Sequence, residues 1–198
     1  AQPERAVVEG EDGAVPNFWP ISDDKHMLLL FSHTRSGRYY VGTYDREAHR
    51  LLPDYRMEGY GDGFLTVRSI KRSIDGALGS HGAWLLEPYT DLPTSSGLNT
   101  APVEDVEETA RIAARHGFQL NVHAIGDRGN REVLDLYQRA WDEAGLDGST
   151  LRWRVEHAQH LHPDDIPRFA DMGVIAAMQG VHATSDGPWV PEKLGDWR

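Results

Sequence analysis

Two histidines lie at the ends of successive stretches that have the composition of β-strands. His123 ends the stretch 117–123, and His157 ends the stretch 151–157. A segment with helical periodicity follows each stretch, so parallel strands joined by helical crossovers would bring both imidazoles to the carboxyl-terminal edge of one sheet. Neutral imidazole nitrogen is a good ligand for borderline metals such as Zn²⁺. The pair therefore indicates a metal site, and two ordinary buried histidines are the alternative.

The elements that would position these histidines can be followed from residue 64 onward, where strand-like and helix-like segments alternate. The segment 102–116 has acidic residues in its first turn, apolar residues at helical spacing, and Gly117 as its stop. The segment 130–144 shows the same spacing. We expect an α/β unit with a parallel sheet, built from strands at 65–71, 118–122, 151–156 and 174–178 and from helices at 102–116, 130–144 and 163–172.

The composition narrows the class of protein. The chain has 198 residues, with 31 acidic and 20 basic side chains and a net charge of -11, which argues against nucleic acid or an anionic membrane as a partner. It has no cysteine, and its longest apolar run, 27–31, is too short to span a bilayer. We expect a soluble, cytoplasmic protein. Because the chain begins at Ala1 without Met and stops abruptly at Arg198, we also expect a fragment of a longer protein.

Several motifs of the second part of the chain occur together in one known family. They are Ile70-Lys71, 75–80 (Asp-Gly-Ala-Leu-Gly-Ser), 121–128 (Asn-Val-His-Ala-Ile-Gly-Asp-Arg), 154–159 (Arg-Val-Glu-His-Ala-Gln) and 165–169 (Asp-Ile-Pro-Arg-Phe). Residues from about 59 to 198 thereby resemble the third amidohydrolase family, metal-dependent hydrolases with a distorted (β/α)8 TIM-type barrel. The resemblance implies a partial barrel, about strands four to seven, in a domain spanning 58–198.

The resemblance also implies the site. His123 and His157 would be metal ligands from the fifth and sixth strands, and Lys71, at a strand end, would bridge as the fourth-strand ligand once carboxylated, because a free ammonium cannot ligate a cation. A lysine that reaches solvent is the alternative. The cofactor would be a divalent metal, Zn²⁺ before Ni, Fe or Mn, and metal-activated water would attack a C–N bond of an amide-like small-molecule substrate. His182 would contact the substrate or the metal's edge, or be an ordinary loop histidine.

Two parts of the family's ligand set have no counterpart in the expected place. The first strand should supply a His-x-His pair, but His160-Leu161-His162 comes too late in the chain, and we interpret it as surface and helix-start residues. The eighth strand should supply an Asp, whereas Asp186 matches a loop, and we interpret it as a solvated carboxylate. Asp127 and Arg128 would orient substrate or His123, or form a loop salt bridge.

The segment 1–57 has a different pattern, with short apolar runs separated by turn residues, typical of antiparallel β-hairpins. Within it, the stretches 15–21, 28–33 and 39–45 are similar to a propeller blade of family thirty-two glycoside hydrolases. This resemblance implies that Glu11 matches the family's general acid/base; a surface loop acid is the alternative. The stretch 59–63 is interpreted as a loop or boundary.

Three functions stay open: a metal-dependent hydrolase fragment with an incomplete site, a fructan-type glycoside hydrolase fragment, and a non-catalytic binding or structural piece. A partial barrel would expose sheet edges, from which we expect self-association.

Overall fold

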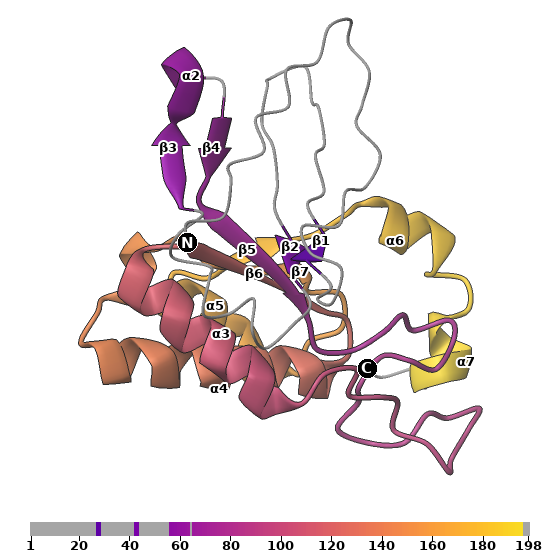
Figure 1. Cartoon of the computed structure of the whole chain (residues 1–198). Helices are drawn as coiled ribbons and strands as arrows, with labels where there is room; N and C mark the ends of the chain where they lie inside the picture. Colours follow the sequence, from indigo (N-terminus) through magenta and orange to yellow (C-terminus); the bar gives the residue numbers. More distant parts are fainter. Residues whose placement is uncertain (1–26, 29–41, 44–55, 64, 196–198) are drawn as a thin grey trace, which may run out of the picture.

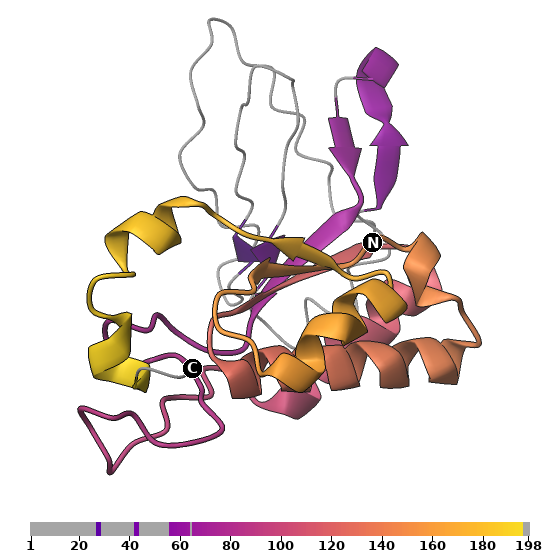
Figure 2. The same cartoon turned by 180° about the vertical axis from the view of Figure 1, so that it is seen from behind.

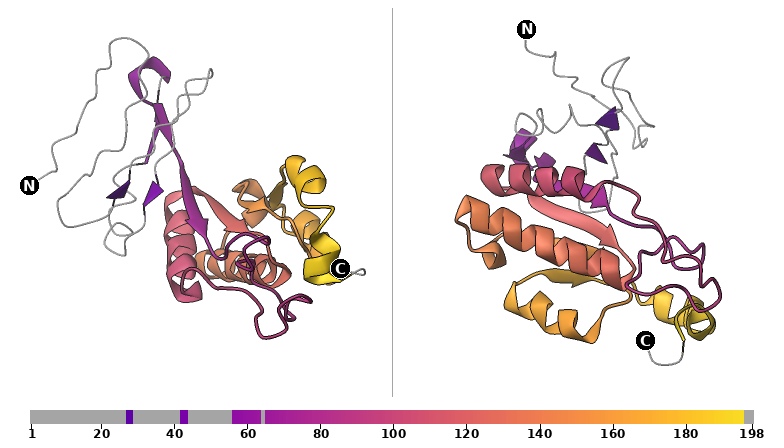
Figure 3. Two further views of the ribbon diagram at one scale, coloured as in Figure 1. Left: turned by 90° about the vertical axis from the view of Figure 1, so that its right-hand side faces the viewer. Right: turned by 90° about the horizontal axis from the view of Figure 1, so that it is seen from below.

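A four-stranded parallel sheet with helices on one face forms the centre of the molecule (Figure 1). The computed structural model describes residues 27–28, 42–43, 56–63 and 65–195. The strand order is β5-β6-β7-β8, and Figure 3 shows the three helices α3, α4 and α5 side by side beneath the sheet. The bounds are β5 Ser69–Ser73, α3 Val103–His116, β6 Gln119–Ala124, α4 Asp127–Ala144, β7 Arg154–His157, α5 Ile166–Asp171 and β8 Ile175–Ala177.

This arrangement confirms the α/β class and the parallel sheet that the sequence predicts. Within residues 65–195 the sheet is open, with β5 and β8 as its outer strands, so closure into an eight-stranded barrel stays a prediction. A helix lies in each connection between successive strands, as predicted: α3 between β5 and β6, α4 between β6 and β7, and α5 between β7 and β8. For example, α3 has Glu104 and Asp105 in its first turn and ends at Gly117, whose φ of 70° is the left-handed conformation that glycine adopts without strain.

Smaller elements precede and follow the sheet. β1 (Met27–Leu28) pairs antiparallel with β2 (Gly42–Thr43), and β3 (Met57–Gly59) pairs antiparallel with β4 (Leu65–Val67) across the helical turn α2 (Tyr60–Gly63). The short helices η2 (Gly148–Thr150) and η3 (Pro163–Asp165) lie in connections, whereas α6 (Val181–Ser185) and α7 (Val190–Leu194) follow β8. Most of the segment 1–57, Glu11 included, lies outside the described residues, so its hairpins and its resemblance to a glycoside hydrolase stay predictions.

The structure corrects the predicted strand 65–71. That segment is divided between two sheets, because β4 pairs with β3 whereas β5 begins at Ser69 and pairs with β6. Lys71 therefore lies in the middle of its strand, and not at the end as predicted. The stretch 59–63, interpreted as a loop, forms the end of β3 and the helical turn α2.

The helix-covered face of the sheet is apolar and forms the core. Side chains alternate between the two faces of a strand, and Ile70, Leu120, Val122 and Val155 lie on the face that packs against α3 and α4. An aromatic cluster anchors α4 to β7: Tyr137, Trp141 and Trp153 pack with ring centroids 4.8 to 5.8 Å apart. The indole N–H of Trp153, which is fully buried, donates to the carbonyl oxygen of Phe118 at 2.8 Å.

The opposite face of the sheet is polar. The strand register places Lys71, Asn121 and Arg154 in one row and Ser73, His123 and Glu156 in the next row toward the carboxyl ends. Arg154 connects the rows, since its Nε donates to Asn121 Oδ1 at 3.1 Å and its guanidinium lies 2.7 Å from Glu156 Oε1. The long loop 74–102 and the helices α6 and α7 lie at the end of the sheet where the strands end (Figures 1 and 2).

Candidate metal centre

His123 and His157 meet at the carboxyl end of the sheet. Their ring centroids are 4.5 Å apart and the ring planes are inclined by 74°. The backbone explains how they meet. His157 is paired in register with Ala124, so simple alternation would turn its side chain toward the helices. However, His157 and Ala158 have φ values of 77° and 44°, which redirect the chain after Glu156. This left-handed conformation costs a non-glycine residue roughly 1–2 kcal/mol, and such strain is found mainly at functional sites.

Hydrogen bonds fix which nitrogen of His157 has a free lone pair. The Gln179 amide is oriented by its N–H donation to the carbonyl oxygen of Ala177 at 2.8 Å, and its Oε1 lies 2.6 Å from His157 Nδ1. Because an amide oxygen only accepts, Nδ1 bears the proton and Nε2 keeps the lone pair. A second partner of this kind is typical of metal-binding histidines.

The environment keeps both imidazoles neutral at pH 7. Burial, together with the charges of His157 and Lys71, lowers the pKa of His123 to about 4. Burial likewise lowers the pKa of His157, against the hydrogen bond to Gln179. His123 Nε2 is buried without a hydrogen bond and lies 3.5 Å from Asp75 Oδ1. Neutral imidazoles with available lone pairs are the form that a metal requires.

Lys71 points to the same polar face from β5. Burial of the ammonium lowers its pKa to about 8, with the Glu156 carboxylate opposing the shift and the Arg154 guanidinium adding to it. Lys71 is nevertheless an exposed residue, and its Nζ donates to the carbonyl oxygen of Arg72 at 3.0 Å. The positive charge of Lys71 also contributes to the lowered pKa values of both His123 and His157. Lys71 is therefore electrostatically coupled to the histidine pair.

Asp75 is a functional candidate that sequence reasoning noticed only as part of a motif. The residue is 2 % exposed, and its carboxylate accepts backbone N–H bonds from Trp84 at 3.0 Å, Ile125 at 3.0 Å and Gly126 at 2.8 Å. Burial raises the pKa of this carboxyl to about 6, opposed by the three N–H groups. Asp75 thereby joins the loop after β5 to the turn that immediately follows His123. The sequence did contain one signal that could have indicated Asp75, namely a carboxylate followed by glycine within the otherwise apolar stretch 74–78.

His182, from α6, lies next to His157 of the histidine pair. Its ring centroid lies 5.3 Å from that of His157, and its Nδ1 lies 3.2 Å from Asp186 Oδ2. Asp186 is not the solvated carboxylate that was predicted. It also accepts hydrogen bonds from Gln159 Nε2 at 2.8 Å and from Ser185 Oγ at 2.6 Å, because α6 turns it toward the strand ends.

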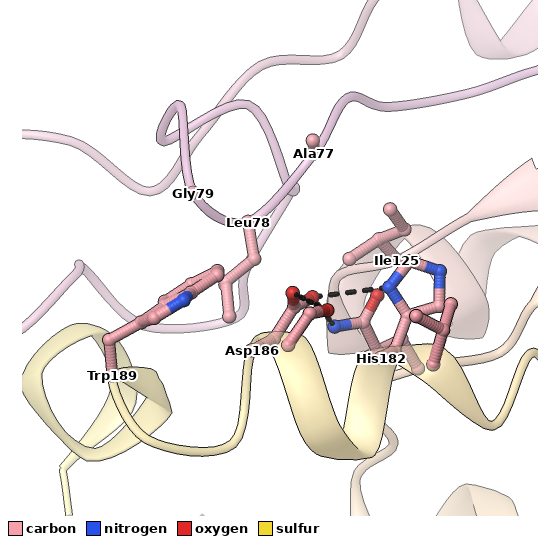
Figure 4. Close-up of a pocket in the computed structure, with 10 residues that line it drawn as sticks. Ala77, Leu78, Gly79, Ile125, His182, Asp186 and Trp189 are labelled. Atoms are coloured by element: carbon pink, nitrogen blue, oxygen red, sulfur yellow. Dashed lines mark hydrogen bonds and ion pairs between the residues drawn. The ribbon is translucent and has the colours of Figure 1, made fainter.

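A hollow of about 280 Å³ opens beside His182 (Figure 4). Its lining comes from the ends of all four parallel strands: the loop after β5, the turns after β6 and β7, and the helices after β8. The lining residues are Ala77, Leu78, Gly79, Ile125, Gln159, Val181, His182, Ser185, Asp186 and Trp189.

The remaining predicted residues lie around this centre with structural roles. His162 starts η3 as predicted, accepting from Asp164 N at 3.2 Å. His160 is not a surface residue, because its Nε2 is buried without a hydrogen bond, and burial lowers its pKa to about 4.

Asp127 and Arg128 each interact with residues of the preceding loop. Asp127 Oδ1 accepts from the backbone N–H of Leu86 at 2.8 Å, and the Arg128 guanidinium lies 4.5 Å from the ring centroid of Trp84. They therefore tie α4 to the loop 74–102. Arg128 also forms an ion pair with Glu132, with Nε 3.8 Å from Oε1, and a role of either residue in orienting substrate or His123 stays a prediction.

The donor set fits part of a metal centre. Two neutral imidazoles suit a borderline divalent cation, and Nε2 of His123 is a buried polar atom without a hydrogen-bond partner. In the part of the chain that the structure describes, no three His, Asp or Glu side chains converge closely enough to hold an ion. The described residues thus offer two histidines, with Lys71 as a third group only after chemical modification.

Comparison with known proteins identifies the family. Residues 33–198 match the model of an amidohydrolase family, and the chain belongs to that family. Over 136 residues, 68% of the chain, it is 37% identical to the protein LONG AFTER FAR-RED 3 of Arabidopsis thaliana, and over 140 residues, 71% of the chain, it is 32% identical to YtcJ of Bacillus subtilis (strain 168). These matches confirm the resemblance found in the sequence motifs.

A solved structure is also similar. An uncharacterized metal-dependent hydrolase of Pyrococcus furiosus superposes with a TM-score of 0.61 at 30% identity, covering 76% of this chain and 31% of that one. The chain spans about a quarter of the length of the curated relatives, 23% of the Arabidopsis protein and 26% of YtcJ. Among the described residues, no helix is both long and apolar enough to cross a membrane.

Proposed function

We propose that the chain forms part of a metal-dependent hydrolase that cleaves C–N bonds of amide-like small molecules with metal-activated water. The observation that supports this most strongly is the convergence of His123 and His157, with ring centroids 4.5 Å apart, at the carboxyl end of a parallel sheet. Membership of the amidohydrolase family and likeness to a metal-dependent hydrolase support the same function.

In this proposal His123 and His157 hold a divalent metal, Zn²⁺ before Ni, Fe or Mn. When bound, such a metal polarises a carbonyl group and lowers the pKa of water. The protein's own contribution is to keep both imidazoles neutral through burial and to orient the His157 ring through Gln179. His182, on the other side of His157, lies where it would contact a substrate.

Lys71 becomes the third ligand after carboxylation by CO₂, which requires the neutral amine. With a pKa of about 8, roughly a tenth of the Lys71 side chains are neutral at pH 7, compared with about one in 3,000 for an ordinary lysine. The low pKa therefore favours this modification. Mass spectrometry of the native protein under CO₂ should detect an added CO₂ that Lys71→Arg abolishes.

We propose that the complete centre needs residues outside these 198, since the family's His-x-His pair and final Asp have no counterpart in the expected order. The four remaining strands of such a barrel would also cover the sheet edges at β5 and β8. We accordingly expect the isolated chain to self-associate, which sedimentation velocity would measure as species larger than the monomer.

Metal binding by the chain is the direct test. Cobalt titration followed by absorption spectroscopy should show binding that His123→Ala and His157→Ala each weaken at least tenfold. His116→Ala is the matched control, because His116 is exposed at the end of α3. Absence of binding by the unmodified chain, or an equal loss in all three variants, would refute a centre built on this pair.

A further inference from the structure

The hollow beside His182 differs from the polar centre in the chemistry of its walls. Its main surfaces are the side chains of Leu78, Ile125, Val181 and Trp189. Figure 4 shows Leu78 and Gly79 on the loop facing the helices that bear His182, Asp186 and Trp189. The loop passes close to the indole, since a Cβ at Gly79 would lie 3.4 Å from the Trp189 ring, which is an ordinary van der Waals distance.

The polar groups at the rim are largely occupied by one another. The Asp186 carboxylate accepts from Ser185, Gln159 and His182, and the Ser185 hydroxyl is the main cause of the lowered pKa of Asp186. No lysine or arginine is among the lining residues. An anionic group would therefore meet an ionised carboxylate with no cation to pair with it.

One polar atom in this region lacks a partner. Gln159 Oε1 is buried without a hydrogen bond, while the Nε2 of the same amide is held by Asp186. An unpaired acceptor at an apolar wall is satisfied by an N–H donor, such as that of an uncharged amide. The apolar walls, the negative charge of Asp186 and the one unpaired acceptor together favour an uncharged, largely apolar ligand with an N–H donor.

We infer that this hollow binds a neutral apolar group, an aryl or branched alkyl chain, of the substrate; this inference rests on the proposed function, in which that group is attached to the scissile amide. The His182 ring at the rim lies 5.3 Å from His157, so a group in the hollow would extend directly from the histidine pair. The volume of about 280 Å³ accommodates an aromatic ring and its linking atoms, since a cavity of about 150 Å³ suffices for benzene.

Ligand-observed ¹⁹F NMR on the metal-stripped 198-residue chain tests the inference. The probes are 4-fluorobenzamide, 4-fluorobenzoate and trifluoroacetamide, which separate ring, charge and amide. We expect saturable binding of 4-fluorobenzamide, with 4-fluorobenzoate and trifluoroacetamide each at least about tenfold weaker, as expected for burial of one ring and for an unpaired anion.

A matched pair of variants locates the binding. Val181 lines the hollow and is 61% exposed, so Val181→Asp should leave the fold intact and weaken 4-fluorobenzamide binding at least tenfold. Leu98 is also 61% exposed but does not line the hollow, so Leu98→Asp should leave binding unchanged.

Equal affinity for the three probes, no binding of 4-fluorobenzamide, or equal effects of the two variants would overturn the inference. Cobalt titration of the same samples separates it from the proposed function. Metal binding without probe binding refutes the apolar subsite alone, whereas probe binding without metal binding refutes the metal centre and leaves an apolar ligand site.

Discussion

Replacing Asp75 by Asn tests how the turn after His123 is held in place. The Asp75 side chain has no exposed surface, and its two oxygens accept N–H bonds from Trp84, Ile125 and Gly126. Asn has the same shape, but one oxygen becomes an NH₂ group that cannot accept. Oδ2 receives the bonds from Trp84 and Gly126, so an amide placed there leaves two buried N–H groups unpaired.

The cost follows from these two groups. An unpaired buried donor costs about 1–3 kcal/mol, so two donors cost roughly 2–6 kcal/mol. Flipping the amide would keep those two bonds and leave only the stronger Ile125 bond unpaired, and burying a neutral amide avoids the desolvation that raises the pKa of Asp75 to about 6. Both effects reduce the cost, and we expect a loss of about 3 kcal/mol in the free energy of unfolding, or roughly 6–12 °C in Tm.

Urea denaturation at pH 7, followed by tryptophan fluorescence, measures this loss. Asp147→Asn is the matched control, because Asp147 is exposed and accepts only local bonds from Ser149, so its replacement should cost about 1 kcal/mol or less. If Asp75→Asn cost no more than the control, the amides of Ile125 and Gly126 would have other partners, and Asp75 would not be the group that joins the two loops.

Three further predictions concern the surroundings of the centre. Gly129→Ala should destabilise the protein by about 1–3 kcal/mol in the same denaturation assay, because its Cβ would lie 2.7 Å from Asp75 Oδ2; an unchanged midpoint would show that the carboxylate can move. Burial lowers the pKa of His160 from 6.5 to about 4, so the stability that the neutral imidazole contributes is present above pH 6.5 and is lost as the pH falls toward 4, by up to about 3 kcal/mol. His160→Gln should therefore flatten the dependence of the unfolding free energy on pH in that range. An identical pH profile in the variant would contradict this. Arg152 is exposed with a φ of 54°, so Arg152→Gly should stabilise the chain by about 0.5–1 kcal/mol relative to Arg152→Ala, and equal urea midpoints would argue against strain there.

The helices and most strands were predictable because their signals are local. The spacing of apolar residues and the stops at Gly117 and Gly145 predict α3 and α4 to within a few residues, and both glycines adopt positive φ as helix ends require. The division of 65–71 between two strands was not predictable, because an apolar run does not indicate which other strand it pairs with. Only the pairing of β4 with β3 and of β5 with β6 separates the two strands.

The candidate site shows the same contrast between local and distant information. The positions of His123 and His157 near strand ends predict that they are neighbours. Asp75 lies 50 residues from Ile125, and Gln179 lies 22 residues from His157, so no local pattern indicates either partner. Their roles depend on the parallel order of the sheet, which brings the ends of β5, β6 and β8 to one edge.

The meeting of the two histidines depends on a backbone feature that strand alternation alone would have contradicted. In register, Glu156 lies beside His123, and His157 lies one residue further along, on the side of the helices. The left-handed backbone at 157 and 158 cancels this alternation and brings the His157 ring to 4.5 Å from that of His123. Glycine would adopt this conformation at no cost but has no imidazole. A sequence that keeps His at a position where glycine would be more stable gives up stability for the side chain itself, which is the arrangement expected where that side chain is a ligand.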